Sequence, residues 1–493
     1  MVRQRGSYIR SSNYVSSPRR FLDRQKLVDT VPSGFRLSAS VSALSDDEEL
    51  TSERIDEILR KNEKSVVVKQ GAIHTVESTL MPSNTPCEDH YSIAKCTPSE
   101  AWLFGVFDGH AGTSCSRHLA RRLFDYICAS VLPKHMKNRD VPEERRLQFL
   151  YTTGDVELPG FEKMSHHENL QRYFSEFHEE LQRRRGPAEE RIETVRQALE
   201  RAFQALDNDI CRDALPDAAG RVSKPAAAVA AAGSCACVVH IRGPHLHVAN
   251  VGDSAAILGV KGLHGAGYTA RRLTVEHTID NASEVARIRK EHPIREINTV
   301  LKGGRLLGQL FPLRAFGDVR YKWSAELQNA VLAPLFNYQV PLNLETPPYL
   351  NAVPEVFYHR LTPNDRFLIL ATDGLWEQLS SERVVRFTAD HDVGVETLGQ
   401  HLPTEHSTVQ QLVYDLRTRH EGRAKQPLDS NSATHLVRHA LGGSSASVTR
   451  QYQRLMESLL LPEQVVRDYR DDISVVVIRF DEDYLREMAE VDN

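Results

Sequence analysis

The sequence predicts an α+β fold, and three observations support this prediction. Apolar runs of strand length alternate with amphipathic stretches of helix length from Ser65 onward. Three consecutive runs, at 234–241, 245–251 and 256–259, are separated only by short turns, as successive strands are. The chain has 493 residues, of which 41% are hydrophobic and 26% charged, so it can form a substantial core.

Two segments precede this pattern. Residues 1–30 start with five arginines and five serines and have no acid before Asp23. This composition is typical of a mitochondrial transit peptide, although a disordered basic tail has the same composition. Residues 31–64 are expected to form a polar linker that leads into a short helix, with acids following Ser45 in its first turn.

Further elements are expected in chain order. Residues 65–78 predict one or two strands and 102–107 another, while 111–132 has an apolar stripe with the spacing of a helix. A second amphipathic helix is expected over 187–206, beginning at Pro187.

The C-terminal half continues with strands at 366–374 and 473–480. The alanine-rich stretch 224–233 is interpreted as a flexible connector into the strand that follows. These elements predict one folded domain over 65–484 and a tail over 485–493. Polar or proline-containing stretches suggest insertions within it, near 135–186, 324–350 and 390–450.

Composition excludes several classes of protein. The net charge of −5 and the lack of a basic, aromatic-interleaved patch argue against a nucleic-acid partner. No apolar run approaches the ~18 residues of a membrane span, so we expect a soluble protein without one. The seven cysteines include no Cys-x-x-Cys pair, which favours reduced thiols over a disulfide or zinc framework.

Acidic residues recur where apolar runs begin or end. Singly, each is most simply a solvated turn residue, but strands of one sheet bring their ends to a common edge, where several carboxylates would repel one another without a cation. Oxygen ligands of this kind select Mg²⁺ or Mn²⁺. The acids concerned are Glu88, Asp89, Asp108, Asp253, Asp373, Asp471 and Asp472.

Such a centre predicts phosphate-ester hydrolysis. Two metal ions about 3.5–4 Å apart can bridge a water, lower its pKa and stabilise an in-line displacement at phosphorus. His110, next to Asp108 in the sequence, could protonate the leaving alkoxide. A metal-dependent nuclease is the nearest alternative on chemistry alone, although no nucleic-acid-binding patch supports it.

The motifs, taken in order, resemble those of the type 2C family of metal-dependent serine/threonine protein phosphatases. They are "CEDHYS" (87–92), "FGVFDGHAG" (104–112), "LHVANVGDSA" (246–255), "LTVEH" (273–277), "PLRAFGD" (312–318), "ATDGLWE" (371–377) and "RDDISVVVI" (470–478). The resemblance implies a four-layer α-β-β-α sandwich, in which two antiparallel sheets pack face to face and a cleft at one end holds two Mg²⁺ or Mn²⁺ ions.

The same resemblance implies a role for each site residue. Asp108 would bridge the two metals, and the Gly109 carbonyl would be a further ligand. Asp373 and Asp471 would complete one metal site, and Glu88 the other through water. Asp253 matches a ligand of a weaker third ion, and His110 the general acid. The arginine with which the family binds substrate phosphate is replaced by Asn84, and the sequence does not identify another base for this role.

Stretches outside these motifs resemble the mitochondrial pyruvate dehydrogenase phosphatase branch of the family; they include "RLLGQLFPLRAFGDVRYKWS" and "NSATHLVRHALG". This resemblance implies a matrix enzyme that acts on phosphoserine of the pyruvate dehydrogenase component, with lipoyl domains and a regulatory subunit as further partners. A cytosolic phosphatase of broad substrate range is the alternative. A pseudophosphatase is disfavoured because all the metal-binding acids are present.

Overall fold

The computed structural model describes most of the chain after residue 49. The described residues are 50–97, 99–131, 150–152, 166–176, 194–262, 267–341, 343–396, 407–423, 427–443 and 448–491. The predicted transit segment at 1–30 therefore lies outside the described residues, as does the stretch that follows Ser45 up to residue 49.

Two six-stranded sheets form the centre of the molecule, and all strand pairs within them are antiparallel. The first sheet consists, in spatial order, of β1 (Lys64–Gln70), β2 (Ile73–Met81), β17 (Ile473–Phe480), β16 (Asp365–Ala371), β10 (Ala255–Lys261) and β11 (Tyr268–Arg272). The second consists of β15 (Glu355–Arg360), β9 (His245–Val251), β8 (Ala236–Arg242), β4 (Ala101–Phe107), β3 (His90–Cys96) and β6 (Leu150–Thr152).

Side-chain alternation along the strands builds a core between the sheets and another on each outer face. In β16, Leu368 and Leu370 join the inner core, whereas Ile369 packs with the helices outside. In β4, Phe104 faces the first sheet and Leu103 faces outward. Successive side chains of a strand point to opposite faces of the sheet. A strand that packs against apolar neighbours on both faces is therefore apolar at consecutive positions, which explains the continuous apolar runs in the sequence.

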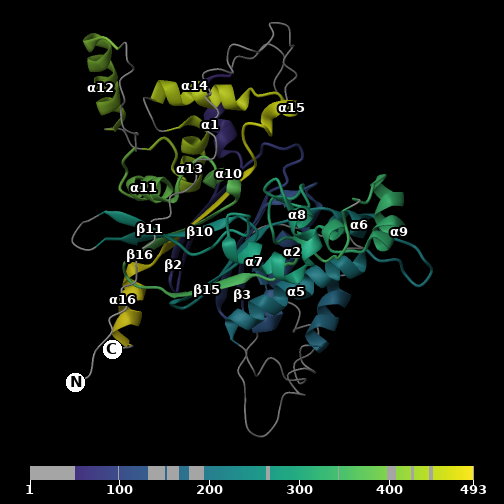
Figure 1. Cartoon of the computed structure of the whole chain (residues 1–493). Helices are drawn as coiled ribbons and strands as arrows, with labels where there is room; N and C mark the ends of the chain where they lie inside the picture. Colours follow the sequence, from purple (N-terminus) through teal and green to yellow (C-terminus); the bar gives the residue numbers. More distant parts are fainter. Residues whose placement is uncertain are drawn as a thin grey trace, which may run out of the picture.

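Helices cover both outer faces, which confirms the four-layer α-β-β-α architecture (Figure 1). The first sheet is covered by α1 (Ser52–Arg60), α11 (Ser381–Asp392), α13 (Ser432–Gly442) and α14 (Val448–Leu459). The second is covered by α2 (Ser114–Val131), α5 (Val195–Asp213) and α6 (Lys224–Ala231).

Shorter elements complete the described fold. Three two-residue strands form a small antiparallel sheet in the order β14-β7-β5, and β12 pairs with β13. Their bounds are β5 (Gly109–His110), β7 (Gly233–Ser234), β14 (Phe316–Gly317), β12 (Leu301–Lys302) and β13 (Arg305–Leu306). The remaining helices are α7 (Ala282–Glu291), α8 (Ile297–Val300), α9 (Ala325–Phe336), α10 (Asp373–Trp376), α12 (Val409–Arg423), α15 (Glu463–Val466), α16 (Glu482–Val491) and the 3₁₀ turns η5 (Ile294–Glu296) and η6 (Val319–Tyr321). Residues 166–176 are also helical, and Leu170 and Tyr173 pack into the core outside the second sheet.

Two predicted elements differ from the structure. The stretch 224–233 is not a flexible connector, because Lys224–Ala231 forms α6 with Ala227 and Ala230 buried. Alanine has the highest helix propensity, and its small side chain allows close packing. The second amphipathic helix begins at Val195 rather than at Pro187, because the Thr194 side chain caps it in a capping box with Gln197.

The predicted linker, insertions and tail contain ordered elements. The short helix before β1 is α1, which begins at Ser52 rather than after Ser45, because the Thr51 side chain caps it; its Ile55 and Leu59 join the outer core. Within 390–450, every residue of α13 is buried. The expected tail boundary at 484/485 falls inside α16, because Leu485 packs into the core between the sheets.

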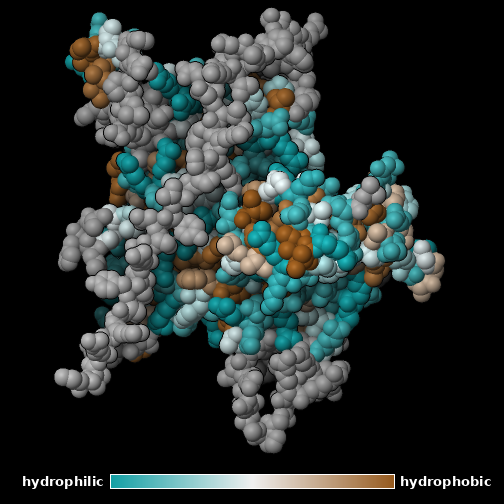
Figure 2. Space-filling model, in the orientation of Figure 1, coloured by the Kyte–Doolittle hydropathy of each residue, from teal (hydrophilic) through white to brown (hydrophobic). Residues whose placement is uncertain are grey.

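The surface and the thiols agree with the composition. Figure 2 shows a mainly hydrophilic face, with hydrophobic residues gathered over α12 and over the region of α7 and α8. The exposed apolar residues there include Val409, Val413 and Ile294. Among the helices that the structure describes, none is long and apolar enough to cross a membrane. All seven cysteines are free thiols, and five of them are buried.

Replacing Leu370 with alanine tests the packing between the sheets. Leu370 is fully buried in the inner core, so we expect Leu370→Ala to lower the free energy of unfolding by about 2–5 kcal/mol. Val67 on β1 is 67% exposed, and Val67→Ala should change it by no more than about 0.5 kcal/mol. Urea denaturation of both variants measures the difference. Equal costs would contradict the placement of Leu370 between the sheets.

Candidate metal centre

Three carboxylates from different strand ends meet at one edge of the sandwich. Asp108 follows β4, Asp253 lies in the turn from β9 to β10, and Asp373 is the first residue of α10, directly after β16. One oxygen atom from each lies within 4.8 Å of the other two. The two sheets thus contribute jointly to this cluster, as the sequence predicted for acids at strand ends.

The electrostatics of the cluster disfavour three bare negative charges. Burial raises the pKa of Asp108 well above its usual range, and the charges of Asp373, Asp89, Asp253 and Asp471 raise it further. Burial likewise raises the pKa of Asp373, with Asp253 the next cause. Charged carboxylates packed this closely need a neutralising cation, and their oxygens are the donors that Mg²⁺ and Mn²⁺ prefer.

Two further acids, Asp89 and Asp472, support the edge; the sequence placed them among the acids at strand ends, and the family resemblance gave neither an individual role. Asp472 accepts hydrogen bonds from the backbone N–H groups of Ser83 (2.5 Å), Asn84 (2.8 Å) and Glu88 (2.7 Å), and so fixes the loop before β3. Asp89 accepts a bond of 2.7 Å from the Thr372 hydroxyl at the end of β16. The sequence offered one signal for these supporting roles: Asp89 directly follows the predicted ligand Glu88, and Asp472 directly follows the predicted ligand Asp471.

Asp471 lies beside this loop rather than in the group of three. Its Oδ1 accepts from the side-chain amide of Asn84 at 3.1 Å, and the same amide donates to Asp472 at 3.0 Å. The Asn84 side chain is thus bound to two carboxylates of its own chain. It therefore orients acids, whereas an arginine at this position would offer positive charge to a phosphate.

Glu88 and Gly109 are packed tightly against each other. A Cβ at Gly109 would lie 2.3 Å from the Glu88 carbonyl oxygen, so only glycine fits. The Glu88 carboxylate accepts from the Gly112 N–H at 2.5 Å and forms an ion pair of 2.7 Å with Arg467. Arg467, just after α15, is 56% exposed, which places a cation at the rim of the site.

His110 contacts a carboxylate that sequence reasoning did not identify. Its Nε2 lies 2.5 Å from Oδ2 of Asp318, a fully buried residue just after β14. Burial alone would lower the pKa of His110, but the charge of Asp318 and its hydrogen bond outweigh burial and raise it. A Cβ at Gly233 on β7 would lie 2.0 Å from His110 Nε2, so glycine is needed beneath this pair.

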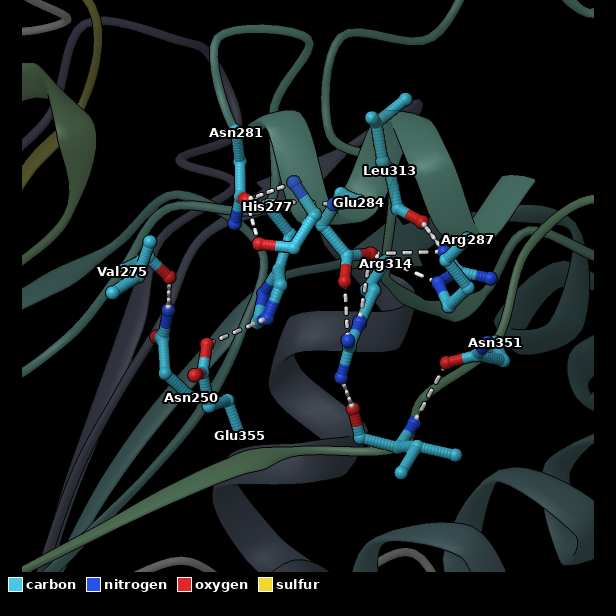
Figure 3. A network of polar contacts seen from close by, with 12 residues as sticks. Asn250, Val275, His277, Asn281, Glu284, Arg287, Leu313, Arg314, Asn351 and Glu355 are labelled. Atoms are coloured by element: carbon cyan, nitrogen blue, oxygen red, sulfur yellow. Dashed lines mark hydrogen bonds and ion pairs between the residues drawn. The ribbon is translucent and has the colours of Figure 1, made fainter. Parts of the chain in front are cut away.

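The turn that carries Asp253 is held by a polar network (Figure 3). The Gly252 N–H donates to Nδ1 of His277 at 3.0 Å, and the Asn250 amide donates to the Val275 carbonyl at 3.4 Å. His277 is fully buried, with Nε2 3.7 Å from Glu355 on β15. The "LTVEH" segment therefore holds the turn that carries Asp253 through Gly252, its neighbour in the sequence.

The same network binds the arginine of the "RAFGD" motif. Arg314 and Arg287 both donate to Glu284 on α7, and Arg314 also donates to the Val353 carbonyl at 2.7 Å (Figure 3). Burial would raise the pKa of Glu284, but the two guanidinium groups reverse this and lower it. Arg314 thus anchors the segment before Asp318 through bonds within the chain.

Taken together, the residues fit divalent metal ions with oxygen ligands. The donors that meet there are carboxylates, and His110 beside them is held by its own acid, Asp318. Phosphate-ester hydrolysis suits this set of groups.

Comparison with known proteins agrees with this chemistry. The sequence profile of the family described as "Protein phosphatase 2C" matches residues 155–394. The chain is 38% identical over 467 residues to the human protein named pyruvate dehydrogenase (acetyl-transferring) phosphatase 1, mitochondrial, covering 87% of this chain and 83% of that one.

Two further relatives extend the comparison. The human protein named pyruvate dehydrogenase (acetyl-transferring) phosphatase 2, mitochondrial, is 36% identical, with 88% of this chain and 84% of that one covered. A protein phosphatase 2C homolog of Schizosaccharomyces pombe is 31% identical, with 86% of this chain and 84% of that one covered. The chain therefore belongs to the protein phosphatase 2C family, and it is a metal-dependent serine/threonine protein phosphatase.

Proposed function

We propose that this chain is a pyruvate dehydrogenase phosphatase of the mitochondrial matrix, which hydrolyses phosphoserine on the pyruvate dehydrogenase component and so activates the complex. The observation that carries the proposal is the close group of Asp108, Asp253 and Asp373 in a chain so similar, along most of its length, to relatives named mitochondrial pyruvate dehydrogenase phosphatases. Residues 1–30, with their transit-like composition, support the location.

The proposed metal ligands are those that the family resemblance implies, and the carboxylates gathered at this edge support the proposal. Phosphatases of this family are in general Mg²⁺- or Mn²⁺-dependent. We assign Asp108 and the Gly109 carbonyl as residues that would hold both ions. Asp373 and Asp471 would contribute to one site, Glu88 to the other, and Asp253 to a weaker third. Bound there, the ions supply Lewis acidity and lower the pKa of a water.

The chain's own residues perform the remaining steps. The carboxylates would fix where the metal ions lie and so where the phosphoryl group can bind, and the close packing at Gly109 and Gly233 leaves little freedom to the loops. Asp318 holds Nε2 of His110 and raises the pKa of the ring, so the protonated imidazole can donate the proton on its other nitrogen, Nδ1, to the serine alkoxide as it leaves. Asp318 acts through His110 and is a positioning residue.

Arg467 is our candidate for the base that binds substrate phosphate in place of the arginine missing at Asn84. It forms an ion pair with Glu88 through one of its nitrogens and keeps more than half of its side chain in solvent. A guanidinium group has five donors, so Arg467 can contact Glu88 and a phosphate oxygen together.

Two partner classes remain part of the proposal. The similarity to the pyruvate dehydrogenase phosphatases supports docking to lipoyl domains of the complex core and to a regulatory subunit. No described residue is assigned to either contact.

Asp108→Asn tests the proposed function. We expect release of phosphate from phosphorylated pyruvate dehydrogenase to require Mg²⁺ or Mn²⁺, and the variant to lose at least about a hundredfold in kcat, because the amide removes the charge that neutralises the ions. Ser283→Ala, on the exposed start of α7, is the control. Activity that persists in EDTA, or an unimpaired Asp108→Asn, would refute the mechanism. Metal-dependent activity on phosphopeptides alone would instead point to the broad-range alternative.

His110→Asn and Asp318→Asn test the proton donor. On a phosphoserine peptide we expect kcat to fall about a hundredfold or more for His110→Asn and less for Asp318→Asn, with KM little changed. On p-nitrophenyl phosphate, whose leaving group is a stable anion, the loss should be much smaller because no proton is needed. Steady-state kinetics with both substrates measures this. Equal losses on both would assign the two residues a structural role.

Arg467→Ala tests phosphate binding. Losing a charge-assisted hydrogen bond of about 1.5–3 kcal/mol should raise the inhibition constant of inorganic phosphate about 10- to 100-fold. Arg467→Lys should retain part of the affinity, and Arg486→Ala on α16, which is 54% exposed, should leave it unchanged. A shift in Mg²⁺ requirement without a shift in phosphate inhibition would mean that Arg467 acts only through Glu88.

A further inference from the structure

A second group of metal-ligating side chains lies in the helical layer outside the first sheet. His435 and His439 belong to α13, and Glu396 follows the end of α11. One ligand atom from each lies within 4.8 Å of the other two. All three residues are buried, with exposed fractions of 0% for both histidines and 4% for Glu396.

Polar atoms of this group lack partners within the described part of the chain. Neither ring nitrogen of His435 has a hydrogen-bond partner there, and the same holds for Oε2 of Glu396. The other carboxylate oxygen, Oε1, lies 2.9 Å from Nε2 of His439. Because native proteins satisfy nearly all buried polar groups, these atoms point to a ligand between them.

The spacing and the donor types identify the class of ligand. Residues i and i+4 of a helix lie on one face, so His435 and His439 present their rings side by side, with centroids 4.4 Å apart. Two imidazoles and one carboxylate form a softer donor set than the all-oxygen cluster at Asp108, and such sets favour zinc over magnesium. We propose that Glu396, His435 and His439 bind a structural Zn²⁺ ion.

The surroundings orient the ligands. The Phe387 ring stacks on His439 with centroids 4.4 Å apart, and the Gln451 amide nitrogen lies 3.5 Å from His439 Nδ1. His391 lies beside His435 at 5.1 Å between centroids, but its Nε2 is engaged by the Asp429 carbonyl at 2.9 Å. Such outer contacts fix ring orientation at metal sites.

The charges around Glu396, His435 and His439 are compatible with a bound cation. Arg438, the cation on the same helix, forms ion pairs with Asp429 at 2.6 Å and with Asp56 of α1 at 2.7 Å, so its charge is matched. Burial lowers the pKa of His435, with His439, His391 and Arg438 as further causes, which keeps its imidazole in the neutral form that binds metals.

The proposed zinc has a structural role, because no side chain of the group is open to a substrate. It would join the segment after α11 to α13, whose Leu436 and Val437 pack on the outer face of the first sheet. The sequence did not reveal this site, since it shows no His-Glu-x-x-His motif and Glu396 lies 43 positions from His439. The proposal is independent of the phosphatase activity.

Metal analysis of the untagged full-length protein tests the proposal. After exposure to Zn²⁺ and dialysis against excess Mg²⁺, we expect about one zinc per chain, retained in Asp108→Asn. His435→Gln and Glu396→Gln should each lower the retained zinc at least tenfold, whereas the neighbouring His391→Gln should keep it. Wild-type protein that holds no zinc, or cluster variants that hold as much as His391→Gln, would overturn the site.

A measurement on the unmodified chain covers the case in which a cluster variant does not fold. Co²⁺ bound by two imidazoles and a carboxylate in tetrahedral geometry gives intense visible bands, which Zn²⁺ should abolish by displacement. Zinc should also raise the thermal unfolding midpoint in the presence of saturating Mg²⁺. Only the weak absorption of six-coordinate Co²⁺, with no shift of the midpoint, would overturn the proposal.

Discussion

The repulsion among closely packed carboxylates at one edge of the sandwich is the constraint on which the rest of the structure depends. Asp108, Asp253 and Asp373 are held within 4.8 Å because the strands that carry them are fixed by two antiparallel sheets. Packing between the sheets therefore holds together carboxylates that would otherwise move apart. A divalent cation relieves this repulsion, so the same interaction that strains the edge makes it a metal centre.

The parts around the centre limit how far these groups can move. Close backbone approaches at Gly109 and Gly233 bring Glu88 and His110 against their partners. Asp472 gathers three backbone N–H groups of one loop, and Asp318 holds His110 from a second. The site is thus an assembly of loops from both sheets, fixed by hydrogen bonds of residues around the three central carboxylates.

The helical layers do more than cover the outer faces of the two sheets. In α13, which reads in the sequence as part of a polar stretch, each residue is buried, and its Arg438 is matched by two acids from other segments. In α6, alanines allow a helix to approach α2 and α5 closely. Composition was misleading in both cases. Whether a polar helix is buried, or an alanine-rich stretch is ordered, depends on the elements that pack against it, and the composition of the stretch does not identify them.

By itself the sequence determined the α+β class, most strands and the acids at their ends, because hydrophobic periodicity and residue type are local properties. Together with its family resemblance, it also indicated the layers and the metal chemistry. Only the tertiary structure decided which side chains meet: Asp318 with His110, Arg467 with Glu88, and Glu396 with His439. These pairs are separated by 208, 379 and 43 positions, and no local pattern encodes a contact across such distances.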